Sequence, residues 1–340
     1  MLLLRHGNVY TPKPIGPATI AVAGGRIEKI GDVNASSFSP TIIDASGCII
    51  TPGLIDCHSH LIGGSGEKGF ASASAGIDAR ELLANGITTV IGLLGTDTTT
   101  RTLPALLAKV KALREQGLNA KMWTGGYDAR SLTGRVRDDI VLIEEIVGAG
   151  EIAIADRRGA HFSPRELARL ASDCYVAGTL TGKAGVLHLH TGELPERLSI
   201  VRELLDRGIS AAALHPTHVN RNEGLLAEAA ELTRRGVAVD FDVVEEDLPR
   251  WWRLFDGDRS LVTISTDAPI GRVGALLEQV RALPLEESLP LATSNPARLL
   301  KLHEAGEIAE GKRADLLVLD ERSLALRYVI AGGEVVHQAA

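Results

Sequence analysis

The chain has 340 residues, of which 36 are basic and 43 acidic, and its formal net charge is −7 at pH 7. This charge, with no block of basic residues, argues against nucleic acid or an anionic membrane as a partner. Three cysteines are too few for a disulfide framework, and no apolar run reaches the roughly 20 residues of a membrane span. We therefore expect a soluble, cytoplasmic protein with one large domain and one small one.

The two ends of the chain share a texture typical of short strands. Residues 1–50 alternate apolar runs with turn signals, as in "LLLRHGNVY" and "TIIDASGCII", and residues 306–336 do the same. We expect one small β-sandwich domain built from residues 1–50 and 305–340, with a different domain over residues 51–304.

Between these ends, buried apolar runs alternate with helical segments at intervals of roughly 25 to 35 residues, as a repeated βα unit requires. One helix is explicit: Ser163 is its N-cap, Pro164 its first residue, Glu166 completes a capping box, and Gly178 stands at its exit. The eight strands are expected to end near His58, Leu94, Trp123, Ala155, His190, His215, Val243 and Ser265. This pattern predicts a (β/α)8 barrel of the TIM type, with its active site at the carboxyl ends of the strands.

Several strand ends carry residues that bind divalent metals. In "IDCHSH" the two-residue period of a strand sends His58 and His60 to one face, and "GVLHLH" ends on His190. Further on, "ALHPTHVNRN" offers His218, and Asp267 follows the eighth strand in "VTISTDAP". Neutral imidazoles and a carboxylate are the ligands that zinc and related ions take. We expect these five residues to converge on a metal site.

Two more histidines, His188 and His215, lie on the same strands. His190 is nearer the end of its strand than His188, and is therefore the better candidate ligand. We expect His188 and His215 to support the site or to pack beside it.

The motifs "PGLIDCHSH", "TSNPARLL" and "GEIAEGKRADLLVLD", together with these histidines and the aspartate, resemble the amidohydrolase superfamily along nearly the whole chain. More narrowly, "HLIGGSGEKG", "VIGLLGTD", "TGGY", "DRRGA" and "PTHVNRN" are similar to the bacterial β-aspartyl (isoaspartyl) dipeptidases. The resemblance implies a homo-oligomeric hydrolase that cleaves the amide bond of β-aspartyl dipeptides by metal-activated water at a binuclear zinc centre.

The resemblance also implies roles for individual residues. The metal ligands that it implies are His58, His60, His190, His218 and Asp267. Asp267 would also shuttle the proton, and Tyr127 would polarise the scissile carbonyl. Glu67, in a glycine-rich loop, would hold the α-ammonium of the substrate. The other substrate contacts that it implies are Arg158 and Arg221, whose guanidinium forks suit carboxylates, with Thr96 and the backbone at Ser65, where the family tends to have glycine.

The chain departs from the family pattern at the bridging ligand. That ligand is usually a carboxylated lysine, and the matching position in "GAGEIAIADRRGA" is Glu151. Glutamate keeps the negative charge but is shorter by roughly 4 Å, at about 1.5 Å per bond. We expect Glu151 to bridge two zinc ions directly. The alternatives are a site that holds a single metal ion and a glutamate that lies away from the metals.

A second departure follows Asp267, where "DAPIGRVG" is shorter than the family's loop and offers no counterpart of its substrate-contacting serine. This departure leaves open an amidohydrolase that acts on a cyclic amide or an N-acyl amino acid. Glu151, in place of the lysine, leaves open a non-catalytic barrel scaffold that has lost its metal.

Overall fold

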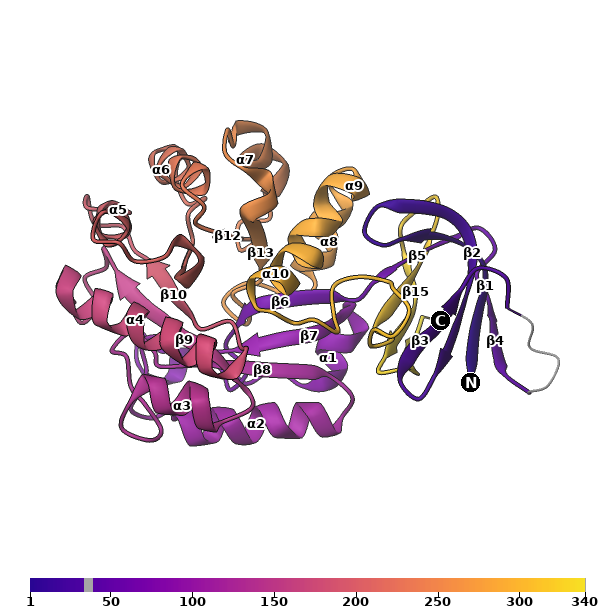
Figure 1. Ribbon diagram of the computed structural model, residues 1–340, viewed down its shortest axis with the longest axis horizontal. Coiled ribbons are helices and arrows are strands. Elements are labelled where there is room, and N and C mark those ends of the chain that lie inside the picture. The colour runs from indigo at the N-terminus through magenta and orange to yellow at the C-terminus, as the bar shows by residue number, and fades with distance from the viewer. Residues whose placement is uncertain (34–38, 340) are drawn as a thin grey trace.

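A computed structural model describes residues 1–33 and 39–339 of the chain. Strands from both ends of the chain form one mixed sheet (Figure 1). Its strand order is β16-β15-β14-β5-β1-β2-β3, and β4 pairs with β1. The strands are β1 (Leu2–Tyr10), β2 (Pro14–Ala23), β3 (Arg26–Ile30), β4 (Thr41–Asp44), β5 (Cys48–Pro52), β14 (Leu316–Asp320), β15 (Leu326–Ala331) and β16 (Glu334–Gln338).

This sheet joins the two termini as the sequence predicts, but it takes the place of the two separate sheets of a sandwich. The reason lies in the pairing of β14 with β5, which runs antiparallel from Leu316 opposite Pro52 to Asp320 opposite Cys48. Because β14 adds to the edge of the N-terminal strands, the C-terminal strands extend that sheet, and buried residues from both ends, among them Leu4, Ile27 and Ile330, share one hydrophobic cluster. The division of the chain into domains at residues 50 and 304 stays a prediction.

The middle of the chain forms a TIM-barrel-like array of parallel strands. Strands β6 to β11 make one sheet, and β12 pairs with β13. An isolated parallel bridge joins Ser59, at the end of β6, to Ala268, shortly after β13. Each of the eight strands ends within two residues of its expected position. They are β6 (Leu54–Ser59), β7 (Ile87–Gly92), β8 (Asn119–Thr124), β9 (Ile146–Ile154), β10 (Val186–Thr191), β11 (Leu214–Thr217), β12 (Val239–Asp242) and β13 (Val262–Ser265).

Helices follow the strands and lie on the outside of this array (Figure 1). In α2 the buried residues Leu106, Val110 and Leu113 recur every three or four positions, so that one stripe of the helix packs inward beside β8. The helices are α1 (Ala79–Ala84), α2 (Leu103–Glu115), α3 (Val136–Leu142), α4 (Pro164–Thr181), α5 (Ser199–Asp206), α6 (Glu223–Arg234), α7 (Leu248–Leu254), α8 (Ala275–Arg281), α9 (Leu285–Ser288) and α10 (Ser294–Leu299). Among the described residues, none of them is both long and apolar enough to cross a bilayer.

Helix α4 confirms its predicted start and corrects its predicted end. Ser163 and Glu166 form the capping box, and Pro164 opens the helix. The helix does not end at Gly178. It continues to a C-cap at Gly182, whose φ of 74° is the left-handed conformation that favours glycine. Gly178 instead provides close packing, because a Cβ there would lie 2.9 Å from the Cα of Gly185.

Candidate metal and substrate site

The carboxyl ends of the barrel strands surround a cavity of about 480 Å³. Nearly all the residues that the sequence singles out line it. They are His60, Ser65, Glu67, Thr96, Tyr127, Glu151, Arg158, His190, His218, Arg221 and Asp267. His58 is fully buried and lies against this wall, with its Nε2 atom 3.3 Å from Oδ1 of Asp267. The eight-strand arrangement therefore brings the predicted residues together from distant parts of the chain.

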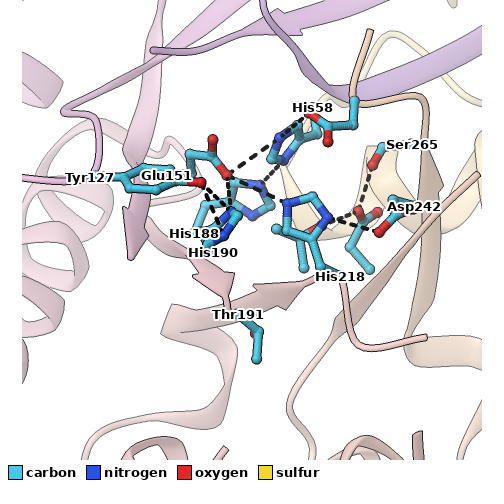
Figure 2. Close-up of polar contacts among 12 residues, drawn as sticks. His58, Tyr127, Glu151, His188, His190, Thr191, His218, Asp242 and Ser265 are labelled. Carbon is cyan, nitrogen blue, oxygen red and sulfur yellow. Dashed lines mark hydrogen bonds and ion pairs between the residues drawn. The ribbon is translucent and has the colours of Figure 1, made fainter. Parts of the chain in front are cut away.

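Glu151 lies at the centre of the four histidines. Its side chain projects from β9 and is almost fully buried, and Figure 2 shows His58, His190 and His218 turned toward it. The Oε2 atom of Glu151 lies 2.9 Å from Nδ1 of His190, 3.5 Å from Nε2 of His58 and 3.6 Å from Nε2 of His218. Its Oε1 atom lies 3.7 Å from Nε2 of His60. This placement contradicts a glutamate that lies away from the site.

Asp267 closes the other side of the group. Its Oδ1 atom lies 3.1 Å from Nε2 of His60 and 3.3 Å from Nε2 of His58. The backbone N–H of Asp267 donates to the carbonyl of His58 at 3.1 Å, which ties the segment after β13 to the end of β6. The carboxylate is thereby held in a fixed position between two imidazoles.

These donor atoms fit a divalent metal ion. Two groups of three have ligand atoms within 4.8 Å of one another: His58, His60 and Asp267, and His58, Glu151 and His218. In the described part of the chain, Nε2 of His58 and Nδ1 of His60 are buried without a hydrogen-bond partner. Because an unpaired buried nitrogen costs free energy, its presence in a set of imidazoles and carboxylates indicates a site for a ligand.

The charges of this group shift the pKa values of its members. Burial acts to lower the pKa of His58, but the negative charges of Glu151 and Asp267 outweigh it and raise that pKa to about 9. Burial acts to raise the pKa of Glu151, but contacts with His58 and His190 hold it well below its ordinary value. Burial likewise acts to raise the pKa of Asp267, but its contacts with His58 and His60 lower it. The carboxylates of Glu151 and Asp267 are therefore ionised at neutral pH, which is the form that binds metal.

The cavity wall above this group carries paired charges. Nη1 of Arg158 donates to Oε1 of Glu67 at 2.7 Å, and the Thr96 hydroxyl donates to the same oxygen at 3.4 Å. Glu67 is half-exposed, so its carboxylate is accessible from the cavity. Ser65 has a φ of 64°, a conformation that glycine adopts more easily, so the serine at this family glycine position carries backbone strain.

Two further predicted residues border the same space. The hydroxyl of Tyr127 lies 2.9 Å from Nδ1 of His190 (Figure 2). Burial raises the pKa of Tyr127 well above its ordinary value, so the phenol keeps its proton. Arg221 donates from Nη1 to the carbonyl of Thr191 at 3.3 Å, and its side chain lines the cavity.

A glycine makes room for this arrangement. A Cβ atom at Gly95 would lie 2.8 Å from Cε1 of His60 and 3.2 Å from Oε1 of Glu151. Any side chain at this position would displace one of the two residues.

Comparison with known proteins identifies the family. The family model described as "Amidohydrolase family" matches residues 49–336. The chain belongs to the amidohydrolase family. Its match covers the barrel strands together with β14 and β15 of the mixed sheet.

This amidohydrolase has similar proteins with different names. Two crystal structures of a β-aspartyl dipeptidase from Fervidobacterium islandicum AW-1, one of them in complex with the β-Asp-Leu dipeptide, are 32% and 33% identical to it, with TM-scores of 0.93 and 0.94. Each comparison covers 99% of this chain and 97% of the other. An imidazolonepropionase of Mycolicibacterium smegmatis is 26% identical over 99% of this chain and 98% of that protein. A dihydroorotase of Streptococcus pneumoniae is 25% identical over 95% of this chain and 91% of that protein.

Two carboxylates of this amidohydrolase were missed by the sequence analysis. Asp156 lies 3.1 Å from Nε2 of His190 and accepts from Arg158 at 2.6 Å. Burial acts to raise the pKa of Asp156, but these contacts hold it well below its ordinary value.

Asp242, at the end of β12, makes the corresponding contacts with a second histidine and a second arginine. It lies 2.8 Å from Nδ1 of His218 and 3.9 Å from Nε of Arg221. Each missed aspartate therefore joins one histidine of the site to one arginine of the cavity. The available signal was position, because Asp242 ends β12 and Asp156 follows β9 by two residues.

Proposed function

We propose that this amidohydrolase uses divalent metal, zinc by its ligand set, to hydrolyse the amide bond of β-aspartyl dipeptides. The observation that supports this best is the composition of one cavity, in which a cluster of metal-binding side chains lies beside an anion, Glu67, and two cations, Arg158 and Arg221. A β-aspartyl dipeptide carries one ammonium group and two carboxylates around its amide, so its charges complement those three residues.

The metal ligands that we propose are His58, His60, Glu151, His190, His218 and Asp267. Glu151 would bridge two ions, since a single carboxylate with contacts to four histidines can serve both halves of the site. A bound zinc ion lowers the pKa of water to about 7 and polarises a carbonyl oxygen as a Lewis acid.

Asp267 and Tyr127 would carry out the proton transfer and the oxyanion stabilisation. The carboxylate of Asp267 is held ionised by the imidazoles of His58 and His60, so it can accept the proton of the attacking water and return it to the leaving amine. The protonated phenol of Tyr127 can donate a hydrogen bond to the oxygen on which negative charge develops.

The pair formed by Glu67 and Arg158 suggests how the substrate is recognised. These side chains neutralise each other at 2.7 Å, and a zwitterionic ligand can replace the contact on both sides at once, with its ammonium on Glu67 and a carboxylate on Arg158. A ligand with only one of these charges would leave one partner unpaired. Arg221 would take the second carboxylate, and Thr96 and the backbone of Ser65 would provide further contacts.

A second candidate is an amidohydrolase for a cyclic amide. The names of the imidazolonepropionase and dihydroorotase relatives favour it, and so does the short loop after Asp267. Its weakness is the Glu67 carboxylate, for which a cyclic substrate without an ammonium group offers no partner. A cytoplasmic location and a homo-oligomeric assembly stay predictions.

Hydrolysis of β-Asp-Leu, dihydroorotate, a hydantoin and an N-acyl amino acid, measured with zinc-loaded protein, tests the proposal. We expect cleavage of β-Asp-Leu, and preferential cleavage of a ring amide would support the second candidate. Metal analysis of protein purified without chelator tests the ligand set. We expect Glu151→Gln to lose bound metal, while Glu193→Gln, which changes an exposed glutamate, retains it.

A further inference from the structure

A run of buried polar side chains leads from the metal site into the interior of the barrel. Nδ1 of His58 lies 2.8 Å from Nε2 of His188, and Nδ1 of His188 lies 2.9 Å from Nδ1 of His215. Nε2 of His215 lies 3.0 Å from the hydroxyl oxygen of Thr263, which contacts Oδ1 of Asp240 at 2.6 Å. These five residues are at most 1% exposed. Because buried polar groups are costly unless paired, this run requires a reason.

Asp240 sets the direction of the hydrogen bonds. Its Oδ2 atom accepts from the hydroxyls of Thr217 at 2.7 Å and Ser265 at 2.6 Å, in keeping with an ionised carboxylate (Figure 2 shows Ser265). An ionised carboxylate only accepts, so Thr263 must donate its proton to Asp240. The oxygen of Thr263 is then left to accept from Nε2–H of His215.

The remaining protons follow from the short contacts between rings. Each N···N contact holds one proton, so Nδ1 of His215 accepts and Nδ1 of His188 donates. Nε2 of His188 then accepts from Nδ1–H of His58. Burial lowers the pKa of His215 to about 4, in keeping with a neutral ring. The outcome is that Nε2 of His58 is the ring nitrogen that faces Asp267 and Glu151.

A second metal site explains these residues less well. Donor atoms of Cys57, His215 and Asp240 are also within 4.8 Å of one another. The hydroxyl oxygen of Thr263 lies among them, at 2.6 Å from Asp240, 3.0 Å from His215 and 3.8 Å from Cys57. With that hydroxyl in the middle, and with burial raising the pKa of Cys57 well above its ordinary value, the group is a junction of hydrogen bonds.

We propose that His188, His215, Thr263 and Asp240 are positioning residues that hold His58 in the tautomer and ring orientation that present Nε2 to the metal. The inference rests on the metal site of the proposed function. A ligating histidine usually donates its second N–H to a carboxylate, a carbonyl or water. Here the carboxylate acts from three hydrogen bonds further away, and Trp123, stacked on His188 with centroids 4.8 Å apart, fixes the intervening ring.

Thr263, at the far end of this run of hydrogen bonds, provides the sharpest test, because it touches neither metal nor substrate. Thr263→Val keeps the shape of the side chain and removes its hydroxyl, whereas Thr263→Ser keeps the hydroxyl. We expect Thr263→Val to weaken zinc binding by about tenfold, within the 10- to 100-fold range for partners of metal ligands, and Thr263→Ser to retain the wild-type affinity. Competition with a chelator measures both. Equal affinities for Val and Ser would overturn the proposal.

The near end gives a matched pair at His188. Leu and Gln both remove the stacking on Trp123, but only Gln can accept from Nδ1–H of His58. We expect His188→Leu to lose about 100-fold in zinc affinity and His188→Gln to recover part of that loss. Equal losses in the two variants would assign His188 a packing role alone.

A metal-free measurement separates this inference from the proposed function. The ¹⁵N spectrum of the histidine side chains should show the Nε2–H tautomer for His215 and the Nδ1–H tautomer for His188. If wild-type protein binds no zinc but shows these tautomers, the proposed metal site is wrong and the run of hydrogen bonds is confirmed. The opposite tautomers, in protein that binds zinc, would overturn the positioning role alone.

Discussion

Two clusters of buried polar side chains occupy the barrel, and they differ in how far their hydrogen bonds are satisfied. At the mouth, Nε2 of His58 and Nδ1 of His60 have no partner among the described residues. In the interior, Asp240 accepts from Thr217, Thr263 and Ser265. Both clusters contain three residues close enough to hold a metal ion. Proximity of ligand atoms therefore does not distinguish a binding site from a junction of hydrogen bonds.

The unpaired nitrogens make that distinction. A buried donor or acceptor without a partner costs about 1–3 kcal/mol, so a protein retains one only where something compensates. The mouth is incomplete until a ligand binds, and substitutions there should alter activity and metal binding. The interior is complete, and substitutions there should alter stability and should affect metal binding only through the position of His58.

Asp267→Asn is expected to give the largest effect at the mouth. The amide cannot accept the proton of the attacking water, so turnover of β-Asp-Leu should fall about 10²- to 10⁴-fold. Circular dichroism should show an unchanged fold. Turnover near the wild-type value would remove Asp267 from the mechanism and weaken the contrast between the two clusters.

Glu67→Gln tests the substrate side of the mouth. Loss of a charge-assisted hydrogen bond costs about 1.5–3 kcal/mol, so kcat/KM for β-Asp-Leu should fall about 10- to 100-fold. The matched control is N-succinyl-leucine, which is β-Asp-Leu without its ammonium group. It should be a poor substrate of both proteins, and a similar loss on both substrates would show that Glu67 does not read the ammonium.

Asp240→Asn tests the interior. An amide NH2 group replaces one oxygen that accepts hydrogen bonds and then faces donors, so the free energy of unfolding should fall by about 1–3 kcal/mol. Urea denaturation of metal-free protein measures this change, with Asp267→Asn for comparison. If the two variants lose equal stability, the division between an incomplete mouth and a complete interior is wrong.

The pH dependence of zinc binding compares one histidine from each cluster without a substitution. The pKa of His58 is raised to about 9, so at neutral pH zinc must displace a proton from it, and affinity should fall about tenfold per pH unit below 9. His215, whose pKa is lowered to about 4, stays neutral over the same range. Chelator competition between pH 6 and 9 measures the slope, and a flat profile would contradict a protonated His58.

The sequence predicted more of the site than its periodicity alone could. Alternation along a strand placed His58 and His60 on one face, and the motifs pointed to Glu67, Arg158 and Arg221. The contacts of Asp156 and Asp242 were not predicted, because their partners His190 and His218 belong to neighbouring strand segments. The C-terminal end of α4 was predicted wrongly for a related reason, since Gly178 makes a tertiary contact and does not end the helix.

The sequence by itself determined the strands and their ends, the amphipathic helices and the ligand types. These depend on local properties, namely side-chain alternation, caps and apolar spacing. Only the tertiary structure decided that Glu151 lies among four histidines, that Glu67 pairs with Arg158 and that Asp240 lies four hydrogen bonds from His58. Those contacts depend on which strands become neighbours and how far each side chain reaches. Residues as far apart as Glu67 and Arg158, which are 91 positions apart, carry no local signal of either.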